Sequence, residues 1–169
     1  HRIFRTMKNT GAYDQQYFRS SKRFQLNPKR TDRFVEEILK HNPKKVLDIG
    51  CGLGALVRRL RELNIEAYGI DNAPVLKEKF WKEGYFEYAD ARAIPYPDEV
   101  FDVVFSADFF EHIEEKDLDI VANEMKRVGE VVLAEIAFEQ ELTERQGKYH
   151  VTNKPKEWWM NKLPGIEIL

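Results

Sequence analysis

The sequence has little of what secreted, membrane-embedded and metal-clustered proteins depend on. Its 169 residues hold one cysteine, Cys51, so an internal disulfide is impossible and no group of thiols can bind a metal. No apolar run approaches the roughly 20 residues of a membrane span. The first five residues, His1-Arg2-Ile3-Phe4-Arg5, offer no apolar stretch of signal-peptide length. We therefore expect a cytoplasmic protein with no membrane partner and no metal.

The sequence also lacks a strong excess of either charge. Its 27 Lys and Arg residues nearly balance 29 Asp and Glu residues. The balance is uneven along the chain, because twelve basic and four acidic residues precede Val46, whereas fifteen basic and twenty-five acidic residues follow it. A solvated helical face explains the basic stretch, and an anionic metabolite or RNA would also fit it. The length and the 43% share of hydrophobic residues suit one domain with a single core.

Glycine is scarce as well, and its placement is informative. The chain has nine glycines, and three of them stand at Gly50, Gly52 and Gly54. An apolar run, Val46-Leu47-Asp48-Ile49, precedes them, and leucines at helical spacing follow. This pattern predicts a buried parallel strand, then a turn that a ligand can approach closely, then a helix whose N-terminus offers free N–H groups.

Two acidic residues narrow what such a turn can bind. Asp48 stands before the first glycine, where a carboxylate disfavours a pyrophosphate and favours a ligand with an ammonium group and a sulfonium. The G-x-G-x-G spacing also departs from the G-x-G-x-x-G of dinucleotide sites. Asp71 ends the next apolar run, where an acid can accept from ribose hydroxyls in either kind of site. An NAD-dependent oxidoreductase is thus disfavoured but stays an alternative.

Three segments carry a family resemblance. Asp48-Ile49-Gly50-Cys51-Gly52-Leu53-Gly54 resembles motif I of the class I S-adenosylmethionine (SAM) dependent methyltransferases of the small-molecule type. Residues 90–102 are similar to the family's Asp-Ala-x-x-Leu-Pro-Phe-Pro-Asp-x-x-Phe-Asp segment, and residues 107–113 to its Leu-Asp-x-Leu-Glu-His-Ile segment. The resemblance implies that SAM is the cofactor. The cofactor-binding residues that it implies are Asp48, Gly50, Cys51, Gly52, Gly54, Asp71, Asn72, Asp90, Ala91, Ser106 and Ala107.

The alternation of apolar runs and helical stripes predicts a Rossmann-like three-layer α/β/α sandwich with a mostly parallel sheet. We expect strands near residues 44–49, 65–70, 85–89, 101–106, 130–137 and 165–169. Family members usually add a seventh, antiparallel strand, and this sequence shows no pattern for it, which leaves the oligomeric state open. We expect residues 1–43 to form an N-terminal lid segment and a helix, and residues 44–169 to form the SAM-binding domain.

The implied reaction is methyl transfer to a small-molecule acceptor. It needs alignment more than a protein nucleophile, and it needs a base only if the acceptor loses a proton. His112 and His150 are the candidate catalytic residues, with Asp108 next. The expected strand end at 106–109 lacks the Asn/Asp-Pro-Pro-Tyr of enzymes that methylate amino groups of adenine or glutamine. An RNA methyltransferase and a SAM-binding partner subunit without activity of its own stay open as alternatives.

Aromatic residues lie on both sides of the predicted cofactor domain. Residues 11–18 are similar to a Tyr-Asp-x-x-Tyr-Phe segment that folds over the cofactor in relatives, which makes Tyr13, Tyr17 and Phe18 candidates for a lid. Asp108 and Trp158 join them as candidates on the substrate side. Aromatic rings that merely pack on the core would give the same pattern. Residues 138–154 have no clear period and are predicted to run over the site as a surface excursion.

Overall fold

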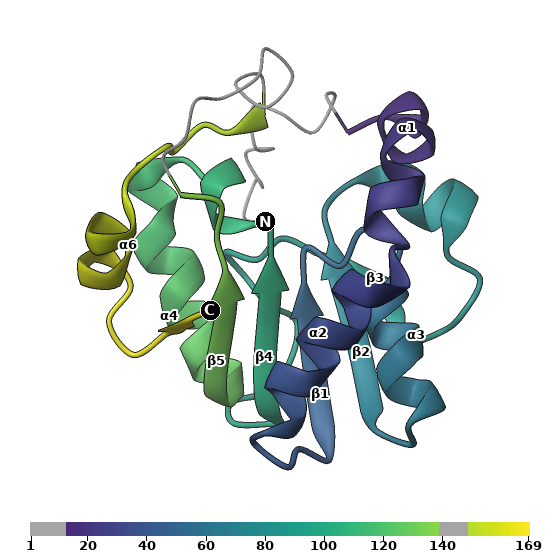
Figure 1. The fold of residues 1–169 in the computed structure, drawn as a ribbon, viewed down its shortest axis with the longest axis horizontal. Coiled ribbons are helices and arrows are strands. Elements are labelled where there is room, and N and C mark those ends of the chain that lie inside the picture. Colours follow the sequence, from purple (N-terminus) through teal and green to yellow (C-terminus); the bar gives the residue numbers. More distant parts are fainter. Residues whose placement is uncertain (1–12, 139–148) are drawn as a thin grey trace.

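The computed structural model of the chain describes residues 13–138 and 149–169. Its centre is a sheet with the strand order β3-β2-β1-β4-β5-β6 (Figure 1). Every strand pairing among the described residues is parallel. The strands are β1 (Lys45–Ile49), β2 (Glu66–Asp71), β3 (Phe86–Tyr88), β4 (Phe101–Ala107), β5 (Gly129–Glu135) and β6 (Glu167–Ile168). All six predicted strands are present, with small shifts at their ends, and the predicted fold class is confirmed.

Helices cover the sheet on both faces. The helices α2 and α3 pack into one core cluster, and α4 and α6 pack into the other. None of the described helices is both long and apolar enough to cross a membrane. The helices are α1 (Gln15–Gln25), α2 (Pro28–Leu39), α3 (Ala55–Glu62), α4 (Leu118–Val128) and α6 (Lys156–Lys162), with a π-helical turn at Leu76–Phe80 and 3-10 turns at Phe110–His112 and Glu115–Asp117.

The central strand β1 is buried on both faces, and its successive residues pack into the two different core clusters. Val46 belongs to the cluster that contains Phe34 of α2 and Val57 of α3. Leu47 belongs to the cluster that contains Trp159 of α6. Both strand residues are fully buried. A strand covered on both faces must be apolar on both, and this explains why β1 is an almost continuous apolar run in the sequence.

The carboxyl ends of the strands meet at one edge of the sheet, the upper edge in Figure 1, where α1 also lies. Ile49 at the end of β1 pairs with Ile70 of β2 on one side and with Ser106 of β4 on the other. The chain thus runs from β1 outward to β2 and β3, and then returns to the other side of β1 with β4. In open parallel sheets the crevice at such a reversal is where ligands bind.

The helix α1 was not predicted from the sequence, where its residues were assigned to a lid. Asp14 caps its N-terminus by accepting a hydrogen bond from the Tyr17 N–H at 2.8 Å. Phe18 is 3% exposed and packs in the same core cluster as α2 and α3. Phe18 therefore joins α1 to the core that α2 and α3 form with the sheet, while α1 itself lies at the carboxyl edge (Figure 1). Residues 1–12 of the predicted lid and 139–148 of the predicted surface excursion lie outside the described residues.

The α6 face of the core gives a direct test of this packing. Trp159 is fully buried, whereas its neighbour Met160 is 57% exposed. We predict that Trp159→Ala lowers the free energy of unfolding by about 3–5 kcal/mol, because it leaves a large cavity in the core. Met160→Ala on the same helix is the control and should change it by less than about 0.5 kcal/mol. Urea denaturation followed by circular dichroism measures both, and equal losses in the two variants would contradict the packing.

Candidate functional site

A cavity of about 750 Å³ opens at the carboxyl edge of the sheet. Its volume lies within the roughly 300–1,000 Å³ of small-molecule sites. Segments that are far apart in the sequence meet in its wall. The residues predicted from the sequence that line it are Tyr13, Tyr17, Phe18, Asp48, Gly50, Cys51, Gly52, Asp71, Asn72, Ala91, Ala107, Asp108, His112 and His150.

The glycine turn forms one wall of the cavity. Gly50, Gly52 and Gly54 all have left-handed backbone angles, with φ of 71°, 51° and 79°. The Gly54 N–H closes the turn by donating to the Cys51 carbonyl at 2.8 Å. A Cβ at Gly54 would collide with the ring of Phe86. Gly54 does not line the cavity, so its role is to let the turn pack against β3.

Two side chains from outside the turn hold its backbone in place. The side-chain oxygen of Gln25, at the end of α1, accepts a hydrogen bond from the Leu53 N–H at 3.1 Å. The indole Nε1 of Trp81 donates to the Gly52 carbonyl at 3.0 Å. Neither residue was singled out from the sequence as part of the site. No local pattern marks either one, because each reaches the turn only through the tertiary fold.

Asp48 is a buried carboxylate at the base of the cavity. It is 6% exposed, and no residue in the described part of the chain donates a hydrogen bond to it. Burial, and to a smaller extent the charge of Asp71, raises the pKa of Asp48 to about 8, and the charge of Arg30 opposes the rise. A cationic ligand in the cavity would supply the countercharge that Asp48 lacks.

Asp71 connects β2 to the glycine turn and also faces the cavity. One of its carboxylate oxygens accepts from the Gly52 N–H at 3.1 Å, and the other accepts from the Ala73 N–H at 3.0 Å. Burial raises the pKa of Asp71, and these backbone hydrogen bonds oppose the rise. Each carboxylate oxygen can accept more than one hydrogen bond, so Asp71 keeps acceptor capacity for a ligand.

Four of the residues predicted from the sequence do not line the cavity, and Gly54 is one of them. The Asp90 carboxylate is engaged by the Arg92 guanidinium, with a shortest distance of 2.7 Å, which leaves it poorly available for a ligand. Ser106 is fully buried within β4, beneath the cavity. Trp158 lies on α6 with its ring centre 5.0 Å from that of Trp159, so it packs on the core and is not placed as part of a lid.

Arg30 of α2 lines the cavity, although it was not predicted from the sequence. It forms an ion pair with Asp108 and lies 3.5 Å from the Glu135 carboxylate. Its guanidinium carbon also lies 4.6 Å from the ring centre of Phe34, which fixes its position over the aromatic face. Arg30 therefore orients Asp108 and supplies positive charge to a cavity that is otherwise rich in carboxylates.

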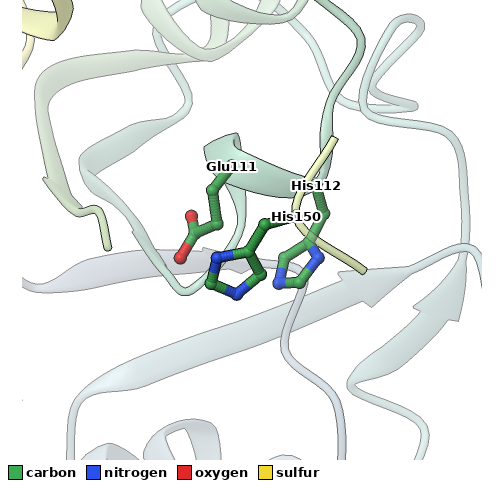
Figure 2. Close-up of side chains that lie close together, drawn as sticks. All are labelled: Glu111, His112 and His150. Carbon is green, nitrogen blue, oxygen red and sulfur yellow. The ribbon is translucent and has the colours of Figure 1, made fainter. Parts of the chain in front are cut away.

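Three side chains that can bind protons or metals lie together where His112 and His150 line the cavity and Glu111 is buried behind them, as Figure 2 shows for the three residues. Their potential ligand atoms all lie within 4.8 Å of one another. Glu111 is fully buried, and burial raises its pKa to about 8. Burial lowers the pKa of His112 to about 4 and also lowers that of His150. Glu111 was not predicted as a site residue, although it precedes His112 in the segment that carries the resemblance.

Backbone hydrogen bonds bring His150 to the other two residues. The N–H groups of Val151 and Thr152 donate to the Glu111 carbonyl at 2.9 and 3.1 Å. The Thr152 hydroxyl donates to the Ile113 carbonyl at 2.7 Å, and Thr152 is 3% exposed. The segment after His150 is therefore fixed onto the 3-10 turn Phe110–His112, and the histidine is held beside it.

Comparison with known proteins supports the family resemblance. A family profile described as a methyltransferase domain matches residues 47–130, from within β1 to the start of β5. The demethylmenaquinone methyltransferase of Thermotoga maritima is 32% identical over 120 residues, which make up 67% of this chain and 52% of that protein. The chain therefore spans about half the length of this relative.

Solved structures agree with the fold. A SAM-dependent methyltransferase from Archaeoglobus fulgidus superposes with a TM-score of 0.58 at 23% identity, over 70% of this chain and 55% of that one. The [4+2]-cyclase SpnF superposes with a TM-score of 0.59 at 20% identity, over 78% of this chain and 54% of that one. With the matched profile, the glycine turn and the two acids at the carboxyl ends of β1 and β2 in a parallel sheet, the chain belongs to the class I SAM-dependent methyltransferase family.

Proposed function

We propose that the cavity binds SAM, with the amino-acid and sulfonium end beside Asp48 and the glycine turn, and the ribose at Asp71. The observation that carries the proposal is the pair of carboxylates at adjacent strand ends that face one cavity. Asp48 has no described partner and would gain a cationic one. Ala91 lines the cavity where the adenine would lie, whereas the Asp90 carboxylate is occupied by Arg92. When bound, SAM supplies a methyl group that its sulfonium has already activated.

The proposed activity is methyl transfer to a small-molecule acceptor. The relative named as a demethylmenaquinone methyltransferase supports this class of acceptor. The cavity offers aromatic surface for it, because Tyr13, Tyr17 and Phe109 line the cavity. His112 and His150 line the same cavity and are the proposed proton acceptors, for acceptors that must lose a proton. A cytoplasmic location is part of the proposal and is supported by the single, buried cysteine.

Three alternatives make different forecasts. A partner subunit without activity would bind SAM but transfer no methyl group, and an RNA methyltransferase would label RNA instead of metabolites. The likeness to a protein named as a cyclase shows that this fold does not by itself imply methyl transfer. An NAD-dependent oxidoreductase would bind NAD in place of SAM.

One experiment separates the activities. The protein is incubated with SAM labelled in its methyl group and with either a metabolite extract or total RNA, and the labelled product is identified by mass spectrometry. We expect label in a small molecule. Label in RNA alone would overturn the proposed acceptor class, and SAM binding without label in either fraction would favour the inactive subunit.

The ribose assignment predicts a loss of affinity at Asp71. By calorimetry we expect the wild-type protein to bind SAM and not NAD, and Asp71→Ala to weaken SAM binding by about 1–3 kcal/mol, the scale of a lost hydrogen bond to a charged group. Asp71→Asn should lose less, because the amide oxygen can still accept from the Gly52 N–H. The control is Glu66→Ala at the start of the same strand, which should bind SAM normally. Normal affinity in the folded Asp71→Ala protein would refute the assignment.

We predict that the buried Asp48 carboxylate lowers the free energy of unfolding at high pH but strengthens SAM binding. Its pKa in the folded protein, about 8, is above the roughly 3.9 of an unfolded aspartate, so its contribution to stability is complete below about pH 4 and is lost as the pH rises towards 8. Asp48→Asn removes this loss. At pH 8 the variant should therefore be more stable than wild type by about 1–3 kcal/mol, the scale of an unsatisfied buried group.

That gain should shrink as the pH falls towards 5, and the same variant should bind SAM more weakly because the cationic end loses its partner. Chemical denaturation at several pH values measures the first effect, and calorimetry measures the second. Asp119→Asn, at an aspartate whose side chain is 67% exposed, is the matched control for stability. A pH-independent change in Asp48→Asn would show that the carboxylate is not responsible.

The lid proposal concerns Tyr13 and Tyr17, whose rings pack against that of Tyr149, a residue far along the chain, with ring centres 5.6 and 5.3 Å from it. We predict that Tyr17→Ala slows methyl transfer about tenfold or more, because an open cavity admits water and misaligns the acceptor, while the melting temperature falls by only a few degrees. Its neighbour Phe18 is 3% exposed, so Phe18→Ala should instead cost about 3–5 kcal/mol of stability. The lid proposal fails if Tyr17→Ala is as destabilising as Phe18→Ala but retains normal turnover per folded molecule.

A further inference from the structure

Glu111, His112 and His150 form a donor set that makes none of the proposed contacts to SAM, and a metal ion bound to it would replace the role of His112 and His150 as proton acceptors. The carboxylate and the two imidazoles come from two segments and have their potential ligand atoms within 4.8 Å of one another (Figure 2). In a metal site with bonds of about 2.0–2.2 Å, neighbouring ligand atoms lie about 3–3.5 Å apart. A contraction of about one ångström, within reach of side-chain rotation, would therefore close these three groups around an ion.

Two atoms of the cluster are buried without a partner among the described residues. One carboxylate oxygen of Glu111 accepts from the Ala137 N–H at 3.1 Å, but the other, Oε2, is buried and has no hydrogen bond. The Nδ1 of His150 is also buried and without a hydrogen bond. Buried polar atoms in native proteins are almost always paired, so these two atoms, which lie in one cluster, are available to bind a ligand.

The third residue is held in the form that metal binding requires. The Nδ1 of His112 lies 2.8 Å from the Tyr149 carbonyl, which can only accept, and 3.0 Å from the Tyr13 hydroxyl, which can donate or accept. In the tautomer that satisfies the carbonyl, Nδ1 carries the proton and donates it to that oxygen. The lone pair is then on Nε2. Metal-bound histidines usually have this arrangement, in which a carbonyl or carboxylate holds the second ring nitrogen and fixes the tautomer.

From these contacts we propose that Glu111, His112 and His150 form a binding site for one divalent transition-metal ion. Two histidines and one carboxylate suit Zn²⁺ or Fe²⁺ and leave coordination positions open. His112 and His150 line the 750 Å³ cavity, so the open positions face it and can take an oxygen donor, such as a hydroxyl or carboxylate group of a small molecule. The site stands independently of SAM binding and replaces the expectation, drawn from the single cysteine, that the protein has no metal.

The alternative occupant of the cluster is a proton. A neutral Glu111 carboxyl could stay beside two neutral imidazoles with no ion between them. Such a cluster would have no measurable affinity for metals, and replacing one member would change only stability. A metal site instead makes affinity depend on each of the three residues.

The test uses the whole chain, produced without a histidine tag and treated with a chelator, and titrates it with Co²⁺ as a spectroscopic probe for the site. We expect one Co²⁺ per chain, with visible absorption bands of the protein-bound ion, and displacement of Co²⁺ by Zn²⁺. Glu111→Gln and His150→Ala should each weaken Co²⁺ binding by at least about tenfold, because even outer-shell changes cost about 10–100-fold. The control is His41→Ala, at a histidine whose only described ion pair is with Glu167, and it should bind Co²⁺ as wild type does.

Circular dichroism and melting of each variant without metal show whether it is folded. His150→Gln serves as the second variant where His150→Ala is unstable, since it keeps the size of the side chain but lacks the imidazole. Saturable Co²⁺ binding that survives in folded Glu111→Gln and His150→Gln would overturn the site, as would the absence of saturable binding by the wild-type protein. Neither result depends on methyl transfer, so failure of this proposal and failure of the proposed activity are distinguishable.

Discussion

The strand β1 has no face exposed to water, and this constraint determines how the rest of the chain is arranged. Both of its edges are paired, with β2 and β4, and both of its faces are covered by helices. A parallel sheet of this kind needs a crossover between strands, so the chain must alternate strand and helix. The polar side chains that can contact a ligand then lie at the carboxyl edge, and Asp48 is the first acidic residue in the sequence that lines the cavity.

The cavity gathers more negative than positive groups. Asp48, Asp71 and Asp108 line it, and Arg30 is the basic side chain among its described lining residues. A protein interior penalises such unpaired charge, and here the penalty appears as raised pKa values for Asp48 and Asp71. The empty site is thus less favourable electrostatically than the filled one, provided that the occupant is a cation. The carboxylates of the cavity therefore favour a cationic ligand, and they disfavour a pyrophosphate because it is an anion.

The parts of the fold that could be predicted from the sequence are those in which local pattern and topology agree. The apolar runs identified all six strands, and the order of Asp48 and Asp71 along the chain placed them at neighbouring strand ends because the sheet is parallel. Asp90 was predicted to bind the ligand from the family resemblance and from its place at a strand end, but its ion-pair partner, Arg92, stands two residues away. The sequence pattern could not show which of the two adjacent tryptophans, Trp158 or Trp159, packs in the core. The structure buries Trp159 completely.

The parts that could not be predicted depend on contacts between distant segments. Gln25 and Arg30 precede β1 and reach the site only because α1 and α2 fold back over the sheet. His150 meets Glu111 because the backbone at Val151 and Thr152 pairs with the Glu111 carbonyl, which no side-chain pattern encodes. Such contacts are set by the packed fold, so sequence reasoning identified the individual histidines and missed the cluster.

The hydrogen bond from the Leu53 N–H to Gln25 has a thermodynamic consequence. This amide stands in the glycine turn just ahead of α3, and Gln25, which lines the cavity, ends α1, so the bond joins the turn to that helix. An amide has one proton to donate, so a ligand atom that takes it must displace the Gln25 oxygen. Linkage requires the reverse effect to be equal: release of α1 favours that ligand contact by the same factor by which the contact favours release. For a ligand that binds this amide, Gln25 at the C-terminal end of α1 is thus a competitor within the same chain. One coupling free energy then relates the release of α1 to the affinity of that ligand.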